Sequence, residues 1–205
     1  MNYMIALKGH VLEFVEEGHT YIIDGVIVPS ITEILSSRFG KKYAGVDKSV
    51  LIRAADKGKE VHAAIEAFCT DGTPSDLPEV RNFIFLQDKY GFHVLGNEIP
   101  VILFDGDKPI AAGRLDLILI MDGQIGGADI KRTSSLDKEY VAYQLNLYRI
   151  AYRQCYGDEW KFLRAIHLRD NVRRFVELPI NEKAALELVA DYMKGKKDEP
   201  CEFDW

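Results

Sequence analysis

The sequence predicts one α/β or α+β domain in which helices flank a mixed central β-sheet. Three observations support this prediction. Apolar residues follow a helical period over residues 48–68 and 138–156, whereas residues 94–131 have the character of consecutive strands. Turn signals that contain Asp-Gly divide the strand-like region into three, which indicates a meander. The chain has 205 residues, enough to bury a substantial core without disulfides.

We expect a single domain over residues 1–205, because the sequence contains no internal repeat, low-complexity tract or evident linker. Its parts differ in the elements they are expected to contain. Residues 1–91 hold an N-terminal hairpin and helices, and residues 92–157 hold the main run of strands and a helix. Residues 158–205 supply the last strands and the last helix.

Helix and turn signals define the elements of the first part. Gly18 lies in a turn between two apolar runs, which is typical of a hairpin. Ser30 and Glu33 have the spacing of a capping box, so a short helix should begin there. Pro78 suits a helix start and Gly91 a helix stop. The predicted elements are a hairpin over 10–28, a short helix after Ser30, and helices over 48–68 and 78–90.

The remaining elements are bounded by turn residues in the same way. Asp-Gly pairs at residues 105–107 and 122–123 mark tight turns between strands. Gly157 closes a helix, and residues 169–171 form a turn between two later strands. The predicted elements are strands over 94–104, 108–120 and 124–131, a helix over 138–156, strands over 162–168 and 173–178, and a helix over 181–194.

Composition excludes several classes of protein. Hydrophobic residues make up 47% and charged residues 28%, which are ordinary globular values. No apolar run approaches the roughly 18 residues that a membrane-spanning helix needs. The N-terminus lacks signal-peptide features, so we expect a cytoplasmic protein. The three cysteines, Cys69, Cys155 and Cys201, are odd in number and scattered, which favours reduced thiols over disulfides and excludes a four-cysteine iron–sulfur cluster.

The charge distribution is uneven along the chain. The net charge is −6, which does not by itself indicate a nucleic-acid-binding protein. Residues 149–174 nevertheless carry seven basic side chains against three acidic ones, and residues 175–205 carry eight acidic against four basic. The basic segment is either a surface that faces DNA or an ordinary solvated face. Its candidate DNA contacts are Arg149, Arg153, Arg173 and Arg174.

Two acidic residues and a lysine stand on adjacent predicted strands. Side chains alternate along a strand, so Asp129 and Lys131 should share one face while Ile130 points to the other. Asp116 lies between two leucines on the preceding strand, and a hairpin brings it near Asp129. Charged groups in an apolar setting need partners. A structural salt bridge would satisfy them, and so would a magnesium site in which the lysine assists an attacking water.

Two helical motifs add polar residues to this region. Gly58 precedes His62 by one turn on an otherwise apolar helix face, which suggests close packing at the glycine. His62 is then either a core histidine or a metal ligand. Gln144 and Tyr148 are four residues apart on the helix that follows Lys131, so they share a face. They are either contacts to a phosphate or base, or a polar helix rim.

In this order, these motifs resemble the RecB-like branch of the PD-(D/E)XK nucleases. The likeness covers roughly residues 19–152, and its opening segment resembles small phage and prophage members. Each motif is weak alone, but five in the right order at hairpin-compatible spacing are specific. They are Gly58-x-x-x-His62, Glu98, Gly113-Arg-Leu-Asp116, Asp129-Ile-Lys131 and Gln144-x-x-x-Tyr148.

The resemblance implies a role for each residue. Lys131 would serve the nucleophilic water, and Gln144 and Tyr148 would contact DNA beside the site. Glu98 corresponds to an acidic residue of the first core strand, with Glu66 as the alternative carboxylate. The metal ligands would be His62, Asp116, Asp129 and the Ile130 carbonyl, with Glu98 as a further candidate.

The function implied by this resemblance is a magnesium- or manganese-dependent deoxyribonuclease without an iron–sulfur cluster. An exonuclease in phage or prophage recombination, repair or DNA processing is expected, in the cytoplasm of a bacterium or an infected host. Its partners would be single- or double-stranded DNA and a separate recombination or helicase protein, and it could form a homo-oligomer. The alternatives are a catalytically silent DNA-binding or assembly module on the same fold, and an unrelated α/β protein with accidental matches.

Overall fold

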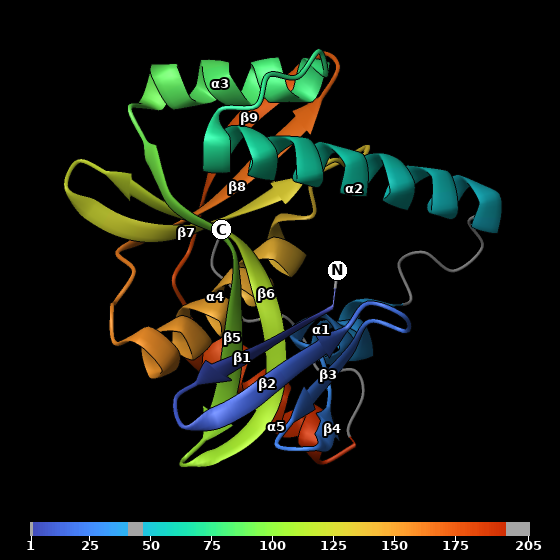
Figure 1. Ribbon diagram of the computed structural model, residues 1–205, viewed down its shortest axis with the longest axis vertical. Coiled ribbons are helices and arrows are strands. Elements are labelled where there is room, and N and C mark those ends of the chain that lie inside the picture. Colours follow the sequence, from blue (N-terminus) through green and yellow to red (C-terminus); the bar gives the residue numbers. More distant parts are fainter. Residues whose placement is uncertain (1, 41–46, 196–205) are drawn as a thin grey trace.

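A computed structural model describes residues 2–40 and 47–195 of the chain. It contains two β-sheets, and the smaller is formed by the N-terminal residues (Figure 1). This sheet is an antiparallel meander in which each strand pairs with the next along the chain. Its strands are β1 (Tyr3–Leu7), β2 (His10–Val15), β3 (Thr20–Ile23) and β4 (Val26–Val28).

The larger sheet has the order β5-β6-β7-β8-β9. All neighbours in it are antiparallel except β7 and β8, which are parallel. Parallel strands need a long crossover, and α4 (Lys138–Tyr156) provides it. The strands are β5 (His93–Asp105), β6 (Lys108–Met121), β7 (Gln124–Lys131), β8 (Phe162–Arg169) and β9 (Val172–Leu178).

Helices cover both faces of the larger sheet. One buried cluster joins the sheet to α1, α4 and α5, and a second joins its other face to α2 and α3. Figure 1 shows α2 and α3 at one end of the molecule and the N-terminal sheet at the other. The remaining helices are α1 (Ile31–Phe39), α2 (Lys48–Asp71), α3 (Pro78–Tyr90) and α5 (Glu182–Met193).

The N-terminal sheet packs against the distal part of the β5–β6 hairpin. Leu12 and Phe14 of β2 are buried together with Ile102 of β5 and Ala112 of β6 in a third cluster. The backbone N–H of Ala112 also donates to the carbonyl of Pro29, which ties the start of α1 to β6. The larger sheet is therefore covered by helices at one end and by a second sheet at the other.

The predicted mixed α+β architecture is confirmed, and the capping signals account for most boundaries. The hydroxyl of Ser30 accepts from the backbone N–H of Glu33 at 2.9 Å, as a capping box requires. Gly91 and Gly157 end their helices in the left-handed conformation. Strand β1 is an addition, because its continuous apolar run lacks the alternation that marks a half-buried strand.

Three further observations bear on the expectations from sequence. A Cβ added at Gly58 would meet nothing within 4 Å, so the expectation of close packing there is wrong. Cys69 and Cys155 are free thiols, whereas Cys201 lies outside the described residues. Among the described residues, no helix is both long and apolar enough to cross a membrane.

Candidate metal centre

The site begins where β6 and β7 separate. Their last paired residues are Leu117 and Ala128, and β7 continues for three residues beside β8 alone. The backbone of Ile130 would lose its partners on the β6 side, but two side chains replace them. Asp116 Oδ2 accepts from the Ile130 N–H at 2.7 Å, and His62 Nε2 lies 3.0 Å from the Ile130 carbonyl oxygen. One peptide unit therefore positions a carboxylate and an imidazole.

Strands β5 and β6 both depart from regular geometry near the point where β6 and β7 separate. Leu115 packs in the cluster that contains α4, whereas Leu117, two residues later, packs in the cluster that contains α2 and α3. Regular alternation would place both on one face, so β6 twists sharply around Asp116. The facing residue of β5, Glu98, has a φ of 49°, a left-handed conformation that is strained for a residue other than glycine. This irregularity directs the two acidic side chains into one space.

Three side chains from three elements form the resulting cluster. His62 Nδ1 lies 3.6 Å from Asp116 Oδ2 and 3.9 Å from Glu98 Oε1. One ligand atom from each residue lies within 4.8 Å of the other two. The second oxygen of Glu98 forms an ion pair with Arg114. The cluster is only half-buried, which leaves it open to solvent ions.

Asp129 and Lys131 approach the same peptide from the α4 side. Lys131 Nζ donates to Asp129 Oδ1 and to Gln144 Oε1, both at 3.0 Å. The Asp129 side chain is 3% exposed, and burial raises its pKa to about 6 although the charge of Lys131 opposes this. Burial would lower the pKa of Lys131, but the Asp129 and Asp116 carboxylates outweigh it and raise that pKa. The lysine therefore stays charged.

Tyr148 of α4 is buried close to Asp116 and Asp129. It is 4% exposed, so it cannot stack on a base as we expected from the sequence. Burial, followed by the nearby Tyr21 and Asp116, holds its pKa well above the usual value. A Cβ at Gly113 would come within 2.8 Å of the Tyr148 ring, which explains why glycine suits this position.

The donor set fits a hard divalent cation. Carboxylate and carbonyl oxygens with one imidazole are ligands that magnesium and manganese accept. Asp129 is not part of this group of three residues. No donor among the described residues is aligned with its buried Oδ2, but Lys131 Nζ lies 2.8 Å away and balances its charge in the metal-free protein.

The structure thus brings most of the predicted site residues together. Gln144 serves Lys131 rather than facing outward, which differs from the DNA contact expected from sequence. Glu66 is exposed, whereas Glu98 is in the cluster, so Glu98 is the better carboxylate candidate. Arg114 was not anticipated, although its place two residues before Asp116 on the same strand was a usable signal.

The predicted basic surface needs correction at Arg149, and Arg153 takes part in an ion pair. Arg149 is 7% exposed, and its guanidinium binds the Trp160 carbonyl and the carboxylates of Glu159 and Glu182. Arg153 also pairs with Glu182, at 2.9 Å. Both arginines hold α4 to the segments that follow it. Arg149 is too buried to track a DNA backbone, whereas the side chain of Arg153 is 37% exposed. Arg173 and Arg174 of β9 are exposed.

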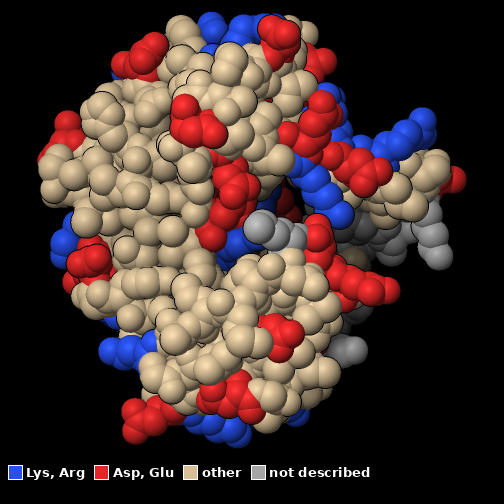
Figure 2. Space-filling model, viewed as in Figure 1, with Lys and Arg blue, Asp and Glu red and all other residues tan. Residues whose placement is uncertain are grey.

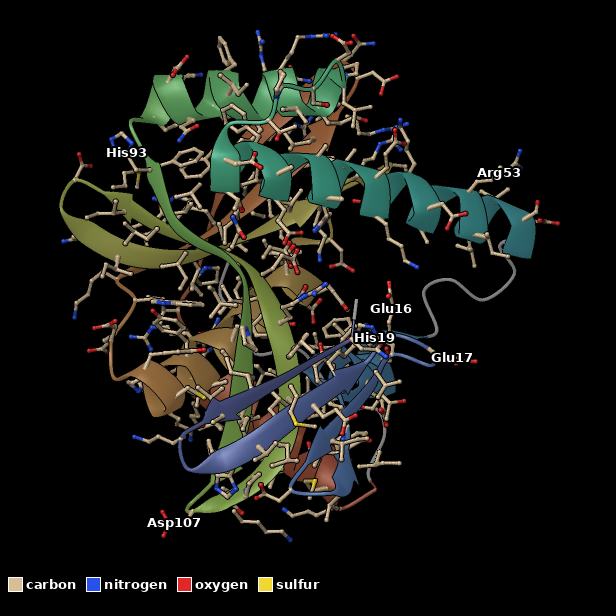
Figure 3. All side chains as sticks on the ribbon, in the orientation of Figure 1. Glu16, Glu17, His19, Arg53, His93 and Asp107 are labelled. Carbon is tan, nitrogen blue, oxygen red and sulfur yellow. The ribbon has the colours of Figure 1, made fainter. Side chains whose placement is uncertain are left out.

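One face of the molecule is hollowed between its two ends (Figure 2). Figure 2 shows a depression between the α2–α3 end and the N-terminal sheet, bordered by both acidic and basic side chains. Glu16, Glu17 and His19 lie at the β2–β3 turn, which reaches toward α2 (Figure 3). Both sheets and α2 therefore contribute to this face.

Comparisons with known proteins identify no family. No family model matches the sequence, and no curated protein is significantly similar to it. Among solved structures, the crystal structure of SSO0001 is similar over 83% of this chain and 77% of that chain, with 15% sequence identity and a TM-score of 0.49. This likeness is too weak to assign a function.

The charge on His62 leads to a prediction about pH. Burial alone would lower its pKa, but Asp116 and Glu98 outweigh burial and raise it to about 9 from 6.5. The protonated form therefore stabilises the metal-free fold below pH 6.5, and this stability is lost as the pH rises through about 9. Metal binding must expel the proton, so manganese affinity should rise by up to about tenfold per pH unit in this window.

Melting curves and manganese titrations between pH 6.5 and 9.5 would measure both trends. His62→Gln should flatten them, because glutamine does not titrate. His93→Gln, at an exposed position at the start of β5, is the matched control and should leave them unchanged. Manganese affinity that is independent of pH in the wild type would contradict a ligand role for His62.

The contact between Gly113 and Tyr148 gives a prediction about stability. Gly113→Ala should lower the free energy of unfolding by about 1–3 kcal/mol, because the buried tyrosine has no room to retreat. Gly58→Ala is the control, in a helix where the added methyl meets nothing, and it should raise stability by roughly 0.5–1 kcal/mol. Urea unfolding of both variants measures the difference. Equal effects would show that Tyr148 does not need the glycine.

Proposed function

We propose that this chain is a metal-dependent nuclease with a PD-(D/E)XK core, which hydrolyses phosphodiester bonds of DNA. The observation that supports it best is the convergence of Asp116, His62 and Lys131–Asp129 on the Ile130 peptide at the opening between β6 and β7. A structural salt bridge explains Lys131 and Asp129, but it does not explain the separate acidic cluster beside them. The motif resemblance favours an exonuclease of phage or prophage type.

Each residue of the site has a proposed role that follows from its chemistry. Asp116, Asp129, Glu98, His62 and the Ile130 carbonyl would hold magnesium or manganese, which lowers the pKa of a bound water and polarises a phosphoryl oxygen. Lys131, at the end of β7, is held by Asp129 and Gln144. There it orients the attacking water and offsets the negative charge that develops on the phosphate.

The DNA backbone is proposed to continue from the site over β8 and β9. In the register of the sheet, Lys131 lies opposite His167 on β8, and His167 lies opposite Arg174 on β9. The three side chains therefore share one face of the sheet. Arg173, on the opposite face, stacks on Phe85 at 3.6 Å and keeps the edge of its guanidinium available. We propose that Arg174, on the same face as Lys131, contacts a phosphate near the scissile bond, and that Arg173 contacts one at the edge of the sheet.

Removing these charges should weaken binding in a salt-dependent way. We expect Arg173→Gln/Arg174→Gln to lower DNA affinity for all sequences alike and to reduce the slope of log affinity against log salt by roughly one unit for each lost phosphate contact. Lys183→Gln, at an exposed position on α5, should leave the slope unchanged. Fluorescence anisotropy in an Asp116→Asn background separates binding from cleavage. An unchanged slope in the double variant would show that these arginines are ordinary exposed residues that do not contact the DNA backbone.

The proposed function is tested by a time course on end-labelled DNA. Linear and circular substrates, single- and double-stranded, are incubated with magnesium, with manganese and with a chelator. Cleavage that depends on metal supports the proposal, and a requirement for free ends supports an exonuclease. If purified protein cuts no DNA with either metal, the alternative of a silent DNA-binding module becomes the better explanation.

A further inference from the structure

A cavity of about 270 Å³ is lined in part by Lys131 and by none of the three residues of the acidic cluster. It is bounded by the end of α1, the loop from β7 to α4, and the first turns of α4. Its size is close to the lower limit for small-molecule pockets. The residues that matter for its chemistry are Ser36, Phe39, Lys131, Thr133, Ser135 and Tyr140.

The walls of this cavity are apolar and its rim is polar. Tyr140 contributes a partly exposed ring, and the buried ring of Phe39 packs edge-to-face behind it with the ring centroids 5.5 Å apart. Ser36, Thr133 and Ser135 also line the cavity, and the hydroxyls of the first two donate to backbone carbonyls, so their oxygens remain as acceptors. Flat apolar surfaces bordered by hydrogen-bonding groups suit a heteroaromatic ring that carries polar atoms on its edge.

Charge argues against a phosphate in the same cavity. Its charged lining residues in the described part of the chain are Lys131 and Asp137. Lys131 is already paired with Asp129, and the Asp137 carboxylate caps α4 by accepting from the Tyr140 N–H at 3.1 Å. A phosphate would meet this carboxylate and find no unpaired cation among the lining side chains. A neutral group avoids that cost.

The cavity is directly connected to the candidate metal centre. Lys131 Nζ lies 5.6 Å from the centroid of the Tyr140 ring, and the same nitrogen donates to Asp129. In the proposed reaction, a group bound against Tyr140 is therefore about one nucleotide away from the phosphate that is cut. We propose that this cavity binds the nucleobase of a nucleotide adjacent to the bond that is cut, an inference that rests on the proposed nuclease function.

A cavity that holds a base makes cleavage sensitive to that base at one position. Oligonucleotides with a single abasic residue at successive positions should be cut normally except at this position, where kcat/KM should fall on the order of tenfold, as expected for loss of one stacked base. Ser36→Trp and, separately, Ser135→Tyr fill the cavity from exposed positions on opposite walls. Ser134→Tyr, at an exposed position in the same loop that does not line the cavity, is the matched control.

Filling the cavity and removing the base should not have additive effects. Each should lower kcat/KM alone, and together they should lower it no further, because both remove the same contact. Additive losses, or equal cleavage at every abasic position by an active wild type, would overturn the base-binding role while leaving the nuclease function intact.

A second experiment distinguishes failure of the proposed nuclease function from failure of this inference. If intact DNA is not cut at all, the cavity is tested directly by saturation-transfer NMR with thymidine, deoxyadenosine and inorganic phosphate as probes. Nucleoside binding that Ser135→Tyr abolishes and Ser134→Tyr preserves would still support a base site. Binding of phosphate alone, or of none of the probes, would refute it.

Discussion

Asp116→Asn is expected to reduce metal-dependent DNA cleavage by about 10³-fold or more. The substitution keeps the size of the side chain and an oxygen that can accept from the Ile130 N–H. It removes the negative charge beside His62 and Glu98, where the candidate cation would bind. Loss of a charged ligand withdraws several kcal/mol of stabilisation from the transition state, and each 1.36 kcal/mol corresponds to a factor of about ten in rate.

Two measurements separate a lost metal site from a damaged fold. Manganese should raise the melting temperature of the wild type but not that of Asp116→Asn, because only a site present in the folded state stabilises it. Asp107→Asn is the control, at the far turn of the β5–β6 hairpin, and should keep both activity and the metal-induced shift (Figure 3). Normal cleavage by Asp116→Asn would remove the central support for the proposed function.

Local signals in the sequence were sufficient to predict most of the architecture. Caps such as Ser30 and Gly157 act through neighbouring backbone groups, so they can be recognised without knowledge of the tertiary structure. Alternation along β7 likewise placed Asp129 and Lys131 on one face and Ile130 on the other. Strand β1 lacked such a signal, since its pairing with β2 depends on tertiary context.

The arrangement of the site depended on features that periodicity cannot reveal. The change of face between Leu115 and Leu117 breaks the alternation on which the sequence argument relied. The left-handed conformation of Glu98 is equally invisible in a strand-like sequence. Arg149 was assigned to a basic surface because a run of charges does not show that Glu182, far along the chain, neutralises it. Functional irregularity and long-range pairing account for these differences.

The environment of Lys131 allows its two roles to be separated. It neutralises a buried carboxylate in the metal-free protein, and it is proposed to act on water and phosphate during cleavage. Lys131→Ala should therefore destabilise the metal-free protein by about 3–5 kcal/mol, because it leaves the charge of Asp129 buried without a partner. Saturating manganese should restore much of that stability, since a cation can replace the ammonium as the partner of Asp129.

Cleavage by Lys131→Ala should nevertheless remain low when manganese saturates the site. We expect kcat to fall about 10²–10³-fold, the usual cost of losing one charge-stabilising donor, with little change in the manganese concentration that half-saturates the variant. Lys138→Ala, at an exposed position at the start of α4, is the matched control and should keep full activity.

Added ethylamine should partly restore turnover in Lys131→Ala, because a free ammonium can enter the space that the side chain leaves. A merely structural lysine would show recovery of activity with manganese and no response to the amine, and that outcome would exclude Lys131 from the chemistry.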